Sequence, residues 1–176
     1  MSEKIENPQF VTRSGVTVPM KVGAGQSPNQ ARNHGVIGSK WTNSITRMEV
    51  EIKPEKDFPG YKRIYRSYPT PDMRYMTVVF SQYTVTPNNG AIYNANGELV
   101  KQLSSPNPNR LDQIASIKWH SDANEENPIM VMDIFVKEST IFNEMESSPP
   151  RDRIEQYIFN VQTLTILPDS IGGYWL

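Results

Sequence analysis

The chain contains no cysteine and only two histidines among its 176 residues. The absence of cysteine excludes disulfides, thiolate metal ligands, thiol nucleophiles and dithiol redox chemistry. Two histidines are too few for a metal site built from several histidines. No apolar run approaches the roughly 20 residues that a membrane-spanning helix needs, so the sequence predicts no membrane span.

A strong excess of charge of one sign is also missing, because 18 basic and 19 acidic side chains give a formal net charge of −1. A general binder of nucleic acids or anionic membranes carries a large positive excess, so we expect no nucleic-acid partner. The length suits one domain with a substantial hydrophobic core, or at most two small ones.

The first 40 residues are poor in large apolar side chains and rich in glycine, proline, serine, asparagine and glutamine. Residues 22–30 carry turn-forming residues and predict a loop. We therefore expect an extended or flexible polar N-terminal arm over residues 1–40, followed by a single β domain over residues 41–176. No basic segment followed by an apolar one opens the chain, so no secretory signal is predicted. The expected location is the cytoplasm or an assembled particle.

From Trp41 onward, apolar and polar residues alternate with a period of two, which is the pattern of half-buried strands. The main runs are residues 48–52, 61–68, 74–86, 114–120, 129–138 and 157–167. The turns at 87–90 and 94–97 both end in Asn-Gly, the dipeptide that tight hairpins favour. Only residues 139–146 and 151–156 are compatible with short helices. About eight short strands separated by turns predict an all-β fold, either an antiparallel barrel or a sandwich.

The strand predicted over residues 129–138 presents Met130, Met132, Ile134 and Val136 on one face and Asp133 on the other. A carboxylate in that position is either paired with a basic side chain or solvated on the outer face of the sheet. Pairing is the commoner arrangement, and acid–base catalysis is the alternative.

Sequence motifs for catalysis are missing elsewhere as well. No Gly-x-Ser-x-Gly motif is present, and Gly23-Ala24-Gly25 lacks the third glycine and the following lysine of a phosphate-binding loop. His120 ends a predicted strand, where alternation places it with Ile114 and away from Trp119. The sequence therefore favours a protein without enzymatic activity and predicts neither a cofactor nor a metal site.

Arginines and tyrosines interleave in residues 61–68 and again at residues 74–75. A guanidinium stacked between phenol rings can hold a planar or anionic ligand, and the same residues are enriched at protein–protein interfaces. Cross-strand packing of tyrosine and arginine on a sheet surface is the structural alternative. The residues that we expect to bind a ligand are Arg63, Tyr65, Arg66, Tyr75, Tyr83 and Asp133.

Charge and the C-terminal residues point toward association with other molecules. Residues 53–74 carry six basic and three acidic side chains, whereas residues 122–155 carry three basic and nine acidic ones. Two such regions can pair within one molecule or between neighbours, which favours a homo-oligomer or protein assembly. The chain ends on Gly172-Gly173-Tyr174-Trp175-Leu176, a tail that we expect to dock onto the β core or onto a neighbouring molecule.

Two hypotheses about function follow. The first is a non-catalytic structural or interaction module that belongs to a larger assembly, such as a virion or a tail. The second is a small β-barrel that binds a hydrophobic or planar anionic small molecule, with a cyclase or isomerase activity as its catalytic form. The run Gly38-Ser39-Lys40-Trp41 resembles the Gly-x-Trp opening of lipocalin-like barrels with one residue more in the spacing, and this resemblance implies a barrel.

Overall fold

The computed structural model describes residues 1–31, 34–52, 57–58, 64–80, 88–107, 112–136 and 152–176, with the backbone alone at residues 64–65. These residues form twelve β-strands, and every strand pairing between them is antiparallel. The predicted all-β class is therefore confirmed.

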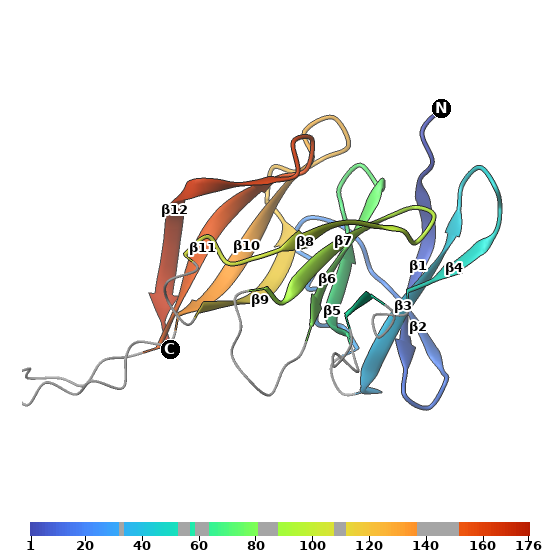
Figure 1. Cartoon of the computed structure of the whole chain (residues 1–176), viewed down its shortest axis with the longest axis horizontal. Helices are drawn as coiled ribbons and strands as arrows, with labels where there is room; N and C mark the ends of the chain where they lie inside the picture. Colours follow the sequence, from blue (N-terminus) through green and yellow to red (C-terminus); the bar gives the residue numbers. More distant parts are fainter. Residues whose placement is uncertain (32–33, 53–56, 59–63, 81–87, 108–111, 137–151) are drawn as a thin grey trace, which may run out of the picture.

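The strands are arranged in three four-stranded sheets (Figure 1). Sheet A has the order β2-β1-β3-β4 and consists of β1 (Ile5–Thr12), β2 (Thr17–Pro19), β3 (Val36–Asn43) and β4 (Glu49–Glu51). Sheet B has the order β5-β6-β7-β8 and consists of β5 (Ile64–Pro69), β6 (Tyr75–Phe80), β7 (Gly90–Asn94) and β8 (Leu99–Leu103). Sheet C has the order β12-β11-β10-β9 and consists of β9 (Asp112–Trp119), β10 (Ile129–Val136), β11 (Arg153–Asn160) and β12 (Thr165–Trp175).

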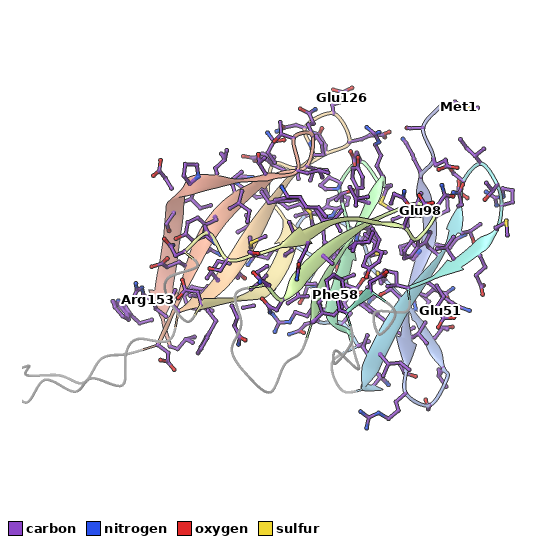
Figure 2. All side chains as sticks on the ribbon, in the orientation of Figure 1. Met1, Glu51, Phe58, Glu98, Glu126 and Arg153 are labelled. Atoms are coloured by element: carbon purple, nitrogen blue, oxygen red, sulfur yellow. The ribbon has the colours of Figure 1, made fainter. Side chains whose placement is uncertain are left out.

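Sheet B lies between the other two sheets, and side chains fill the space on both of its sides (Figures 1 and 2). Strand β6 shows this arrangement within one strand: Met76, Val78 and Phe80 face sheet A, whereas Val79 faces sheet C. Within the described strands, the three sheets remain open and do not close into a barrel. The architecture is that of stacked antiparallel sheets.

Two hydrophobic cores result from this stacking. The first core lies between sheets A and B and includes Ile5, Phe10, Trp41, Ile52, Met76, Val78, Phe80 and Tyr93. The second core lies between sheets B and C and includes Tyr68, Val79, Ile92, Leu103, Ile114, Ile117, Met130, Met132, Ile134, Val136, Tyr157 and Phe159. The four apolar residues expected on one face of β10 are thus all in the second core.

The N-terminal residues differ from the expected polar arm. Residues 1–40 supply β1, β2 and the first part of β3, and β1 contributes Ile5 and Phe10 to the first core at 2% and 1% exposure. Asn7 has a positive φ of 50°, and the pairing of β1 with β3 shifts register between Glu6 and Gln9. This bulge breaks the period-two pattern, which is why the sequence does not reveal the strand.

The second Asn-Gly turn is confirmed. The backbone N–H of Asn94 donates to the carbonyl of Glu98 at 3.0 Å, and Gly97 adopts a φ of +79° between β7 and β8. The turn also covers the first core, because the indole N–H of Trp41 donates to the carbonyl of Ala95 at 2.8 Å. Asn-Gly therefore fixes both the hairpin and one end of the core.

Three further expectations on strands are corrected in sheet C. Residues 151–156 were compatible with a helix, but Arg153–Asn160 is strand β11. The predicted run over residues 157–167 spans the end of β11, a turn and the start of β12. Ile114 joins Ile117 in the second core instead of sharing the outer face with His120, because a register shift between Asp133 and Ile134 leaves Ala115 as an extra residue in β9.

Candidate binding cleft and edge strand

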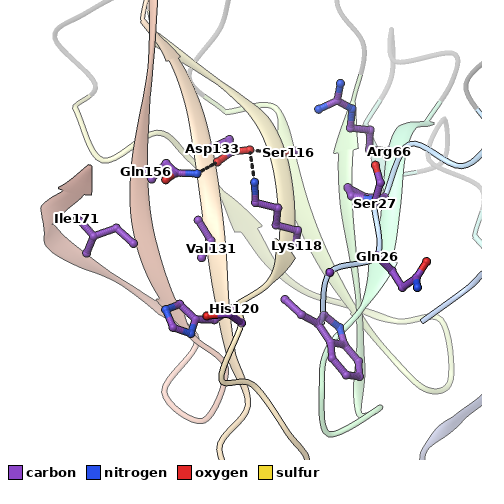
Figure 3. A pocket seen from close by; sticks show the side chains of 14 residues that line it. Gln26, Ser27, Arg66, Ser116, Lys118, His120, Val131, Asp133, Gln156 and Ile171 are labelled. Carbon is purple, nitrogen blue, oxygen red and sulfur yellow. Dashed lines mark hydrogen bonds and ion pairs between the residues drawn. The ribbon is translucent and has the colours of Figure 1, made fainter. Parts of the chain in front are cut away.

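An open cleft of about 590 Å³ lies between the outer face of sheet C and the loop that joins β2 to β3 (Figure 3). The loop contributes Gly25, Gln26, Ser27 and Pro28, and β5 contributes Arg66. Sheet C and the turn after β9 contribute Ser116, Lys118, Trp119, His120, Ser121, Val131, Asp133, Gln156 and Ile171.

Asp133 organises the sheet wall of the cleft. The residue is buried, at 7% exposure, on the face of β10 opposite the second core. The carboxylate accepts hydrogen bonds from Ser116 Oγ and from Gln156 Nε2, both at 2.8 Å. Lys118 Nζ lies 3.3 Å from the same carboxylate, so the expected pairing with a basic residue is present. One carboxylate thus orients three side chains from β9 and β11 (Figure 3).

The opposite wall is a loop over residues 21–30 whose ends are joined. Gln30 accepts from the backbone N–H of Lys21 and donates to the carbonyl of the same residue, both at 2.6 Å. The Tyr68 hydroxyl donates to the Lys21 carbonyl at 2.8 Å and accepts from the Gly23 N–H at 3.0 Å. A loop closed in this way keeps its shape through its own contacts, and the predicted loop over residues 22–30 is confirmed.

Arg66 connects the loop to sheet C. Its Nε donates to Asn29 Oδ1 at 2.9 Å, and its Nη1 donates to the Ala115 carbonyl at 2.7 Å. Ala115 is the extra residue of the β9 bulge, so the bulge provides the carbonyl that receives the guanidinium. Arg66 therefore helps to hold the two walls of the cleft at a fixed separation.

Trp119 and His120 line the cleft where β9 ends. The Trp119 indole N–H donates to the Pro69 carbonyl at 2.8 Å, so the ring offers apolar surface to the cleft. His120 Nδ1 accepts from the backbone N–H of Asp122 at 3.1 Å.

Two of the six predicted ligand-binding residues, Arg66 and Asp133, line the same cleft. Tyr75 lies elsewhere: it packs against the second core, beside the guanidinium of Arg74, and lines a separate hollow near the N-terminus. Arg63 and Tyr83 lie outside the described residues, and so does the side chain of Tyr65.

Lys118, Gln156 and Ser116 belong to the cleft but were not predicted. Alternation along β9 places Ser116 and Lys118 on one face, and this signal is visible in the sequence. Their position opposite Asp133 depends on the pairing of Asp133 with Ser116 and Gln156, which no local pattern encodes.

The cleft combines charged side chains with apolar surface. Lys118 and Asp133 form an ion pair in its wall, and the Arg66 guanidinium donates hydrogen bonds to Asn29 and to the Ala115 carbonyl. In the described part of the chain, no three histidine, aspartate or glutamate side chains are grouped as metal ligands. The same part of the chain has no helix of the length and apolarity that a membrane span requires.

The second feature of sheet C is its outer edge, strand β12. Its eleven residues are exposed or half-exposed, and Leu167, Ile171, Tyr174 and Trp175 are 45–61% exposed. The C-terminal residues pair with β11, with Tyr174 opposite Ile154, but their aromatic side chains stay exposed instead of plugging the β core as expected. The Trp175 ring also lies under the guanidinium of Arg153, 5.6 Å from its centre.

The other sheet edges differ from β12. Strands β2 and β4 have three residues each, and β4 carries two glutamates. Strand β8 has five residues and includes the charged Lys101. Strands β5 and β9 are edges of different sheets, but they contact each other. Strand β12 has eleven residues with Asp169 as its one charged side chain. Long edges with few charges are prone to pair with a strand of another chain, and in β12 the regularly paired stretch is residues 172–175, because Pro168 and register shifts against β11 interrupt the rest.

No family model, curated protein or solved structure matches the chain.

Proposed function

We propose that this protein is a non-catalytic interaction module that assembles through the edge of strand β12. The observation that carries the proposal is the long, exposed and almost uncharged edge of sheet C. Its outward backbone groups have no neighbouring strand within the described residues. Such groups can accept a further strand by main-chain hydrogen bonding.

The partner in this proposal is a second copy of the chain. A single charge in eleven residues gives little repulsion against an identical edge. Antiparallel pairing of β12 with its own copy also covers both edges at once and forms a closed, symmetric dimer. Exposed apolar side chains such as Tyr174 and Trp175 become buried in that arrangement and stabilise it.

The test compares the full chain with two lysine variants by sedimentation equilibrium over a wide range of protein concentration. Tyr174→Lys places a charge on the β12 edge at a residue that is 54% exposed, so unfolding is not expected. Val100→Lys places the same charge on β8, where the native residue is 42% exposed.

We expect the unaltered chain and Val100→Lys to dimerise equally, and Tyr174→Lys to weaken the dimer by about tenfold or more. A monomer at every concentration, or equal weakening by both variants, contradicts the proposal.

A further inference from the structure

We propose that the cleft between sheet C and the loop over residues 21–30 binds a small planar organic anion, with Lys118 contacting the anionic group. The inference is separate from β12 assembly, because the Lys118–Asp133 ion pair that carries it lies on β9 and β10; from β12, Ile171 alone lines the cleft (Figure 3). The cleft volume of about 590 Å³ lies within the range of small-molecule sites.

The charge of the ligand follows from the hydrogen bonds of Asp133. Its carboxylate accepts hydrogen bonds from Ser116 and Gln156 and forms an ion pair with Lys118, so its negative charge is stabilised inside the protein wall. The Lys118 ammonium has three N–H donors, and its side chain remains 37% exposed. An anionic group in the cleft can therefore bind Lys118 while Asp133 stays in place and keeps the ammonium oriented.

The planar shape follows from the rest of the lining. Trp119, whose N–H is bonded to Pro69, offers its ring, and Val131 and Ile171 add aliphatic surface. Across the cleft, Gln26 and Ser27 supply polar groups from the loop. An aromatic or conjugated carboxylate satisfies both parts, because its ring contacts the apolar surface and its charged end reaches the lysine.

The loop wall is ordered before any ligand arrives. Gln30 joins the two ends of the loop, and Tyr68 bonds to its backbone at two residues. Arg66 ties Asn29 to sheet C. A cleft with fixed walls loses little conformational freedom on binding, which favours affinity for a small ligand.

The test is an NMR titration of the full chain, with 2-naphthoate as the probe and uncharged 2-naphthalenemethanol as its matched control. The three tryptophan indole N–H signals report separate places: Trp41 the first core, Trp119 the cleft and Trp175 the β12 edge. We expect naphthoate to shift the Trp119 signal in a saturable way and to leave the Trp41 signal unchanged. The alcohol should bind much more weakly.

Variants of the ion pair then separate specific binding from general hydrophobic contact. Lys118→Gln should weaken naphthoate binding by about tenfold, whereas Lys118→Arg and the distant Lys101→Gln should retain it. Asp133→Asn is nearly isosteric but removes the carboxylate that orients the Lys118 ammonium, so it should also weaken naphthoate binding. Unchanged Trp41 signals in each variant verify that the first core is folded.

Three results overturn the proposal: no saturable shift of Trp119, a shift of Trp175 in its place, or equal affinities for the acid and the alcohol. Loss of binding in Lys101→Gln to the same extent as in Lys118→Gln contradicts it too. Dimerisation is measured separately by sedimentation equilibrium, so the absence of naphthoate binding leaves the β12 proposal unaffected.

Discussion

The two hydrophobic cores on either side of sheet B differ in how their tryptophans are used. Both Trp41 and Trp119 donate an indole hydrogen bond to a backbone carbonyl at 2.8 Å. Trp41 is 1% exposed inside the first core, whereas Trp119 packs partly against the second core and lines the cleft. The same kind of hydrogen bond therefore holds Trp41 inside the first core and holds the Trp119 ring where a ligand in the cleft can contact it. The comparison indicates that sheet A mainly buries one face of sheet B, whereas sheet C carries the candidate functional surfaces.

The largest expected effect tests the two tryptophans directly. Trp41→Ala should lower the free energy of unfolding by about 3–5 kcal/mol, because it opens a large cavity among fully buried side chains. Trp119→Ala should cost only about 2 kcal/mol, since part of its ring already contacts water. Urea unfolding followed by circular dichroism measures both. Equal losses would mean that the second core depends on its tryptophan as strongly as the first.

A smaller loss of stability is expected when either of two glycines, one beside each core, is replaced by alanine. A Cβ on Gly90 would lie 2.8 Å from Ile114 Cδ1 and 3.0 Å from Leu103 Cβ, both in the second core. Gly90→Ala should therefore destabilise by about 1–3 kcal/mol through overpacking.

The matched substitution is Gly38→Ala in sheet A. There the new Cβ would lie 3.3 Å from the Ile52 carbonyl oxygen, a milder contact. We expect a loss below about 1 kcal/mol in urea unfolding. If Gly38→Ala lowered the free energy of unfolding more than Gly90→Ala, the second core would be the one that accommodates an added methyl group more easily.

The smallest effect concerns two tyrosines at high pH. Burial raises the pKa of Tyr93 in the first core, and the nearby Asp57 carboxylate raises it further. Burial also raises the pKa of Tyr68 above its ordinary value of 10.0, which the hydrogen bond from Gly23 partly offsets. Because the folded-state pKa values are raised, the associated stability is present below pH 10 and is lost as the pH rises through them.

Urea unfolding at a series of pH values up to 11, roughly one unit above the ordinary tyrosine pKa, measures this loss. Tyr93→Phe should flatten the alkaline decline more than Tyr68→Phe, since its pKa is raised by a carboxylate as well as by burial. At neutral pH each variant should cost about 1 kcal/mol per lost hydrogen bond, of which Tyr93→Phe loses one and Tyr68→Phe two. If both variants lose stability at high pH as the unaltered chain does, the loss is caused by groups other than these two tyrosines.

The sequence predicted the fold best where strands are regular. In β10 every second residue is apolar and buried, and the Asn-Gly turn after β7 requires a positive φ that Gly97 supplies. It failed at bulges, because one extra residue reverses the alternation. Strand β1 was missed at the irregularity around Asn7, and Ile114 was assigned to the wrong face by the bulge at Ala115.

The candidate cleft was predictable only in part, for a related reason. Asp133 is conspicuous because a carboxylate interrupts an apolar strand, and Arg66 lies in the segment rich in arginine and tyrosine. Lys118 and Gln156 come from neighbouring strands, and only the register between strands brings them to Asp133. Tyr75 belongs to the same kind of arginine- and tyrosine-rich sequence as Arg66, yet it lines a different hollow.

By itself the sequence determined that this protein is built from short antiparallel strands, because period-two alternation and Asn-Gly turns act through local geometry. The absence of cysteine likewise excluded whole classes of chemistry without any structure. Tertiary structure alone decided that sheet B is covered on both faces, since an apolar face can be buried against any partner of suitable shape. It also decided that β12 remains at an open edge, because strand order depends on contacts between segments far apart in the chain.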